Sequence, residues 1–183
     1  MKPLRSAPGL IVGWVWLAIA AVNLVDLAVR GRDRASAVAA AVLVLTCGLV
    51  YALCLRPRVT AGETALHVHN PFRTTRLPWD EITEIDSGRV LTVSYEGGRV
   101  GSWAVQVSGR AAARAKKAKP DPGLPQGLAA QAAGRTVVDF AAERLNEVRA
   151  RSHGGGEVAV TWAWPALLAV LAPLAALVVL LVV

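Results

Sequence analysis

The chain has 183 residues, enough for one domain of ordinary size or for a smaller domain joined to membrane spans. Apolar residues make up 54% and charged residues 18%, and the mean hydropathy of +0.44 argues against a water-soluble protein. Lys and Arg outnumber Asp and Glu by 20 to 13. In a membrane protein such an excess sets orientation, so we expect no nucleic-acid partner.

Three segments with almost no charge are long enough to cross a bilayer as helices. They run from about residue 10 to 29, from 35 to 55 and from 158 to 183. Four tryptophans lie toward the N-terminal ends of the first and third segments, where indole rings favour the membrane interface: Trp14, Trp16, Trp162 and Trp164. We therefore predict a multi-pass membrane protein with the lipid bilayer as one partner.

The first two spans are joined by only five residues, RGRDR at 30–34, and must form an antiparallel hairpin that occupies residues 1–55. Because the side with more Lys and Arg stays cytoplasmic, we expect residues 56–157 inside the cell. The basic hairpin loop conflicts with this orientation. An alternative is that residues 1–20 form a cleaved signal peptide, although the apolar run continues to Val29 and favours a full span.

The bases that set this orientation fall on two sides. The cytoplasmic side would hold Lys2, Arg5, Arg56, Arg58, Arg73 and Arg76, with the bases before the third span, and the other side Arg30, Arg32 and Arg34.

Residues 56–152 change to an alternating pattern, which predicts an antiparallel β domain. Turns are expected at Asn70-Pro71, Ser87-Gly88 and Gly97-Gly98. Two buried-type residues, Ile82 and Ile85, have the wrong parity for one regular strand, so a helical turn at 78–81 or a bulge should precede or interrupt it. The last strand, 100–107, should place Trp103, Val105 and Val107 on one face.

Two further segments complete this domain. Residues 109–134 are rich in Ala, Pro, Gly and Lys, a composition typical of a disordered insertion. Residues 135–151 form an amphipathic pattern that predicts a helix packed on the sheet. The expected apolar stripe comprises Val137, Phe140, Ala141, Leu145 and Val148. The fold class is thus α+β between membrane helices.

The segment Arg56–Asp86, RPRVTAGETALHVHNPFRTTRLPWDEITEID, resembles the bacterial PH-like domain of actinobacterial membrane-anchored proteins of the low-molecular-weight protein antigen 6 type. The resemblance rests on Arg-Pro-Arg after a membrane hairpin, on the turn Asn70-Pro71-Phe72, and on Leu77-Pro78-Trp79 before an acid and Ile82. It implies a PH-like antiparallel half-barrel closed by the helix 135–151. The insertion at 109–134 and the third span depart from the family pattern.

Clusters of reactive side chains have simpler explanations than a catalytic or metal site. His67 and His69 share a strand face, but no third ligand is spaced nearby. The acids of 80–86 lack the glycine pattern of a calcium loop. Cys47 and Cys54 would lie about 10.5 Å apart along one helix, beyond disulfide reach.

Asp26, within the first span, is one helical turn from Arg30 and is expected to pair with it or with Arg34. No motif for a catalytic triad, a phosphate-binding loop or a cofactor is present in the sequence. We therefore expect no enzyme, no metal and no cofactor.

Binding is the remaining class of function. A run of bases without an acid could contact an anionic leaflet, each base adding about 1 kcal/mol: Arg110, Arg114, Lys116, Lys117 and Lys119, with Arg73 and Arg76 on the folded part as further candidates. A solvated linker explains the run equally well.

Two hypotheses follow from these observations. The first is a non-catalytic scaffold or protein-interaction module at the cytoplasmic membrane face, in envelope maintenance. The second is an accessory subunit that contacts a larger transport or secretion complex through its spans.

Overall fold

The structure is a computed structural model that describes residues 3–107, 113 and 136–182. Two compact units make up the chain. The helical unit comprises residues 5–57, 70–74 and 161–183, and the β unit comprises residues 1–4, 58–69 and 75–160. Strands β3 and β7 cross the division.

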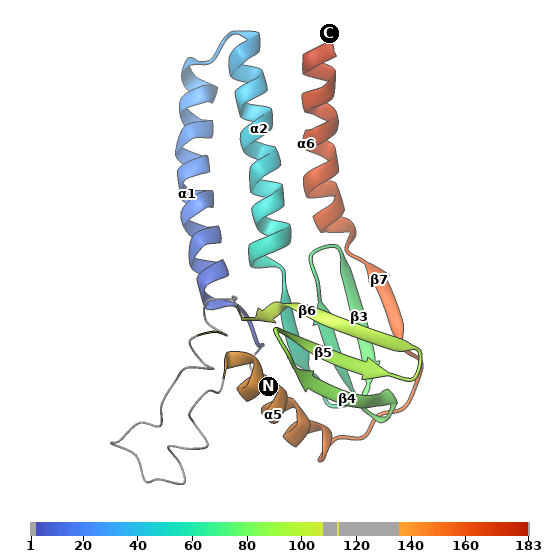
Figure 1. Cartoon of the computed structure of the whole chain (residues 1–183). Coiled ribbons are helices and arrows are strands. Elements are labelled where there is room, and N and C mark those ends of the chain that lie inside the picture. Colours follow the sequence, from blue (N-terminus) through green and yellow to red (C-terminus); the bar gives the residue numbers. More distant parts are fainter. Residues whose placement is uncertain (1–2, 108–112, 114–135, 183) are drawn as a thin grey trace, which may run out of the picture. The chain divides into compact units, whose positions relative to one another are not determined.

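The helical unit contains three helices long and apolar enough to cross a membrane: α1 (Ala7–Arg30), α2 (Arg34–Val50) with its π-helical continuation η1 (Tyr51–Leu55), and α6 (Trp164–Val182). Helix α2 packs against both α1 and α6 (Figure 1). Ser6 and Asp33 begin α1 and α2 by accepting hydrogen bonds from Gly9 N and Ser36 N. Hydropathy therefore predicted the helices, and polar caps define where the first two start.

Helix α6 is held to α2 by a close backbone approach at Gly48 and by hydrogen bonds from Arg34. A side chain at Gly48 would collide with the Ala169 carbonyl, so only glycine lets these backbones approach. At the other end, the Arg34 guanidinium donates two hydrogen bonds, of 2.9 and 2.6 Å, to the Leu180 carbonyl. The hairpin loop and the last turn of α6 thus lie at the same end of the helical unit.

The third predicted span, 158–183, is wrong at its start. Residues Ala159–Trp162 form strand β7, and the helix begins only at Trp164. Trp162 is therefore a strand residue, whereas Trp164 opens the helix as expected. The run VAVTW has no charged residue to mark the change from strand to helix, so hydropathy merges the two.

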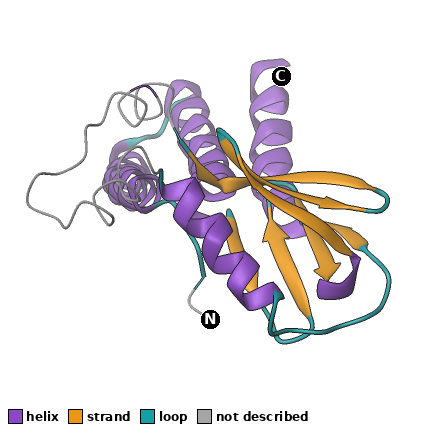
Figure 2. Ribbon diagram, turned by 60° about the horizontal axis from the view of Figure 1, so that its bottom comes forward, coloured by secondary structure: helices purple, strands orange, loops and turns teal. Residues whose placement is uncertain are grey.

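The strands form two antiparallel sheets, with order β1-β2-β3-β7 in the first and β4-β5-β6 in the second (Figure 2). Their bounds are β1 Arg58–Ala61, β2 Ala65–His69, β3 Arg73–Pro78, β4 Ile82–Ser87, β5 Val90–Tyr95 and β6 Gly98–Gln106. The described strands do not close into a barrel. The predicted α+β class and the turn at Gly97-Gly98 are confirmed, with Gly98 at a φ of 147° that favours glycine.

The irregularity at Ile82 and Ile85 has both causes that the sequence suggested. A short 3-10 helix, η2 (Trp79–Glu81), leads into β4, and the register of β4 against β5 shifts between Ile82 and Glu84. Both isoleucines are buried as a result. Parity alone therefore detected a real bulge.

The predicted face of the last strand is wrong at Trp103, which is 48% exposed, while Ser102 and Ala104 are buried. Pairing moves from Val90↔Gln106 to Thr92↔Gly101, so β6 advances five residues while β5 advances two. This bulge reverses the inward and outward positions along β6. Val105 remains buried as predicted.

Helix α5 (Val137–Arg149) packs on β4, β5 and β6 (Figure 2), and the predicted stripe is wrong at two of its five residues. Val137 is 75% exposed and Phe140 is 52% exposed. Val138 and Ala142 are buried in their place, while Ala141 and Leu145 are buried and Val148 is partly buried as predicted. Small alanines let the helix backbone approach the sheet, and a capping box between Thr136 and Asp139 fixes its first turn.

Candidate binding surfaces

The turn between β2 and β3, at 70–74, belongs to the helical unit and is held there by Arg56. The Arg56 guanidinium donates to the carbonyls of Asn70 and Pro71 and, at 2.8 Å, to the Thr74 hydroxyl. Phe72 packs on the small cluster of Ala52, Ala163 and Ala166. The motifs Arg-Pro-Arg and Asn-Pro-Phe, which carried the family resemblance, therefore act together to fix this turn to the ends of η1 and α6.

Arg73, a candidate lipid contact, lies over the ring of Trp162, with 4.3 Å from the guanidinium carbon to the ring centroid. This cation–π contact leaves Arg73 exposed but gives it a structural partner. Arg76, the second candidate on the folded part, lies three residues further along β3 and is partly buried.

His67 and His69 occupy the outward positions of β2, since Leu66 and Val68 between and beside them are buried in the core. The two imidazole rings stack with centroids 6.3 Å apart. Partial burial and, next, the charge of Arg76 lower the pKa of His67 from its ordinary value. No group of three or more His, Cys, Asp or Glu able to hold a metal occurs among the described residues.

Of the four acids in 80–86, Asp80 holds the chain after α5. Its carboxylate accepts a hydrogen bond from Gly154 N at 3.2 Å and lies 3.8 Å from His153 Nδ1. The neighbouring Trp79 donates a hydrogen bond from its indole nitrogen to the Gly62 carbonyl at 3.0 Å. The Trp-Asp pair of the sequence motif therefore joins two loops, one at Gly62 and one at Gly154.

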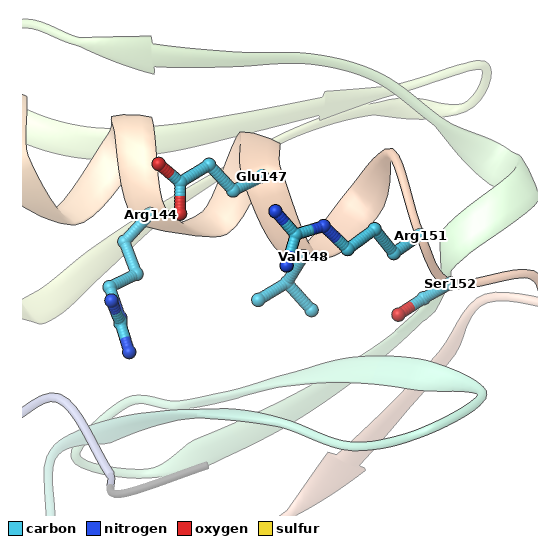
Figure 3. A pocket seen from close by; sticks show the side chains of 5 residues that line it. All are labelled: Arg144, Glu147, Val148, Arg151 and Ser152. Carbon is cyan, nitrogen blue, oxygen red and sulfur yellow. The ribbon is translucent and has the colours of Figure 1, made fainter.

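Two depressions border α5. One, of about 220 Å³, is lined by Arg144, Glu147, Val148, Arg151 and Ser152, with Val148 between the two arginines in Figure 3. The other, of about 730 Å³, lies between α5 and the end of β4 and is lined by four acids: Asp86, Asp139, Glu143 and Glu147. Asp139 already accepts both capping hydrogen bonds of Thr136. Both depressions are open surface features.

Polar groups of the spans are also paired. Asp26 lies 3.0 Å from Arg30, which confirms the predicted pair. Asn23 donates to the Ile19 carbonyl of its own helix at 2.8 Å. Cys47 and Cys54 are free thiols, as expected. The basic run from Arg110 to Lys119 lies outside the described residues.

Three helices able to cross a bilayer, joined to two antiparallel sheets and one packed helix, define a membrane-associated α+β protein of the PH type. Residues 56–164, more than half of the chain, match the family described as bacterial PH domain, and the chain belongs to this family. No curated protein and no solved structure gives a match. The narrower resemblance to actinobacterial antigen-type proteins stays a prediction.

Some residues of interest were missed at the level of sequence. Arg58 and Thr60 on β1 lie opposite His69 and His67, and only the strand register reveals it. The sequence signal for this pairing was the alternation of polar and apolar residues at Arg58, Val59 and Thr60, which matches the alternation of outward and inward residues along β2.

Proposed function

We propose that the protein is a non-catalytic binding or scaffold module held at the cytoplasmic membrane face, with a role in envelope maintenance. The observation that carries the proposal is the order of the chain: a bacterial PH domain at 56–164 is preceded by two apolar helices and followed by a third. PH-like domains generally bind rather than catalyse. Anchoring on both sides in the sequence would keep such a domain permanently near the bilayer.

The cytoplasmic position is supported by the distribution of Lys and Arg and is tested by thiol labelling in intact cells. In a variant without Cys47 and Cys54, a single cysteine replaces Ser87 in the β unit. A matched variant carries its cysteine at Ala35, exposed in the first turn of α2 at the hairpin end. An impermeant maleimide should label the Ala35→Cys chain and spare the Ser87→Cys chain. Labelling of the Ser87→Cys chain alone would place the domain outside.

The basic run is proposed to contact anionic lipid together with Arg73 and Arg76, without choosing one headgroup. Its bases are separated by alanines in the sequence, so charge rather than order should matter. Trypsin reports this contact directly, because it cleaves after Lys116 and Lys117. Nanodiscs with anionic lipid should slow this cleavage relative to neutral nanodiscs, and salt should restore it.

A scrambled sequence over 110–119 is the matched control and should be protected equally well. If the parent were cleaved equally fast in neutral and anionic nanodiscs, the basic run would not contact anionic lipid and would be a solvated linker.

The alternative, an accessory subunit of a larger transport or secretion complex, draws on the large apolar residues that α1 leaves exposed, such as Ile11, Val22 and Val29. Lipid alone can cover these side chains, so the scaffold role is preferred. Crosslinking in native membranes separates the two: partners lost when the β unit is exchanged support the scaffold, and partners lost when the spans are exchanged support the subunit.

A further inference from the structure

Helix α1 has one face packed within the helical unit and one face that is exposed. The packed face lies against α2 and η1 (Figure 1), and Gly13 and Ala20 are buried there. On the exposed face, residues spaced alternately by four and three along the chain lie on one stripe, as in the contact seam of a coiled coil. One such stripe, which we call the mixed seam, consists of Val12, Trp16, Ile19, Asn23, Asp26 and Arg30, all of which are exposed.

A second stripe of the same spacing runs beside the mixed seam and is entirely apolar. This apolar seam consists of Ile11, Val15, Ala18, Val22, Val25 and Val29, which are also exposed. Lipid tails are as apolar as these side chains, so lipid covers the apolar seam without any protein partner. The mixed seam differs, because every Asn, Asp and Arg of α1 lies on it. Polar side chains are thus confined to one stripe of the exposed face.

Asn23 lies too deep in α1 for its short side chain to reach water. It precedes the end of the helix at Arg30 by seven residues, which is about 10.5 Å of helix. The 24 residues of α1 extend for about 36 Å, roughly 6 Å more than the hydrocarbon layer of a bilayer. Even with all of that excess at the Arg30 end, Asn23 would remain about 4 Å inside the hydrocarbon.

The carboxamide of Asn23 is satisfied only in part by its own helix. One N–H donates to the Ile19 carbonyl at 2.8 Å. A carboxamide also has a second N–H and an oxygen that accepts two hydrogen bonds. Neither has a partner among the described residues. Because lipid tails offer no hydrogen bonds, an exposed carboxamide at this depth favours contact with another helix that carries polar groups.

A second copy of the chain supplies such a helix. Copies inserted with the same topology have parallel α1 helices, so that Asn23 of each lies at the same depth and the two carboxamides can exchange hydrogen bonds. A single Asn on the contact seam fixes register in this way in parallel coiled coils. Asp26 and Arg30, 3.0 Å apart on one helix, would each meet the opposite charge near the same level of the other. Another protein would have to present its own polar groups at these depths, whereas a second copy always does.

We propose that two copies of the chain associate in the membrane through the mixed seam of α1, as a parallel pair with Asn23 against Asn23. The proposal goes beyond the proposed function by naming a partner. It rests on that function in one respect only, that α1 crosses the bilayer. The pairing accounts for the confinement of the polar side chains to one seam, which coverage by lipid does not require.

Disulfide crosslinking in native membranes tests which seam is in contact. In the variant without Cys47 and Cys54, a single cysteine replaces Ile19 of the mixed seam or, as the matched control, Val22 of the apolar seam; both residues are exposed and apolar. Two forms of each variant with different affinity tags are expressed together at a low level and oxidised mildly. Ile19→Cys should give an adduct with both tags, because a paired seam brings the two Cα atoms within the ~7 Å that a disulfide requires. Val22→Cys should give roughly tenfold less.

Variants at Asn23 test whether the carboxamide holds the pair together. In the Ile19→Cys chain, Asn23→Leu should lower the yield of the double-tagged adduct about tenfold, because the interhelical hydrogen bonds are lost. Asn23→Gln keeps a carboxamide at the same position and should preserve most of the yield. An undiminished yield from Asn23→Leu, or equal yields from Ile19→Cys and Val22→Cys, would overturn the proposal.

Two further readouts separate this proposal from its alternatives. An adduct of Ile19→Cys that joins one tagged chain to a different protein would assign the mixed seam to that protein and overturn the assignment to a second copy. Extraction of the membranes at alkaline pH tests the anchoring itself. A chain that stays in the membrane but gives no double-tagged adduct would refute the pairing alone, whereas a chain released into solution would refute the proposed anchoring and the pairing with it.

Discussion

Shortening Leu145 to alanine tests how α5 is attached to the β unit. Leu145 is 0% exposed and packs in the same core as Leu91 and Val93 of β5. The substitution removes three buried carbons, which costs about 2.4 kcal/mol in transfer energy at ~0.8 kcal/mol each. The cavity left behind raises the expected loss of stability to about 2.5 to 5 kcal/mol.

Amide hydrogen exchange of the full chain in micelles measures this loss locally. The amides of β5, the central strand of its sheet, are expected to exchange through opening of the whole β unit. Since 1.4 kcal/mol is tenfold, Leu145→Ala should speed their exchange by roughly 60-fold or more.

Phe140→Ala is the control on the same helix. Its ring is half exposed, so its removal should cost only about 1 kcal/mol and speed exchange roughly fivefold. Equal or larger acceleration by Phe140→Ala would refute the exposed position of Phe140 and restore the stripe expected from sequence, in which both Phe140 and Leu145 are buried.

Three further changes should have distinct effects. Gly48→Ala should lower the thermal stability of the helical unit in micelles because the new Cβ meets the α6 backbone, whereas Gly9→Ala, which meets only ordinary contacts, should not. Ser102→Ala should raise the free energy of unfolding of the β unit by about 1 kcal/mol and so slow exchange in β5, because it removes a buried hydroxyl that has no partner in the described part of the chain. Burial and Arg76 lower the pKa of folded His67, so the β unit should keep its full stability above the ordinary value of 6.5 and lose stability as the pH falls below it. The free energy of unfolding, measured by amide exchange from pH 8 to 5, should therefore decline less steeply in His67→Gln than in the parent.

Hydropathy and turn chemistry were sufficient for the helices and for most of the β domain. Length and apolar composition located three helices able to cross a membrane, and Gly97-Gly98 located the hairpin between β5 and β6. The parity of Ile82 and Ile85 was informative because a one-residue bulge changes which side chains face the core. These signals are local, so they survive without knowledge of the tertiary fold.

The errors arose where two local patterns were equally regular. In VVDFAAERLNEV, a stripe through Val137 and Phe140 and another through Val138 and Ala142 both have helical spacing. The larger ring favoured the first, but close approach to the sheet selects alanines. The bulge in β6 and the pairing of Arg58 with His69 both depend on register between strands, which one sequence does not reveal.

The two outer strands of the first sheet, β1 and β7, are the ones that adjoin helices able to cross a membrane. Only Arg56 and Pro57 separate η1 from β1, and only Ala163 separates β7 from α6. Each edge strand is therefore continuous along the chain with such a helix, one or two residues away, so neither edge of the first sheet is a free end of the chain.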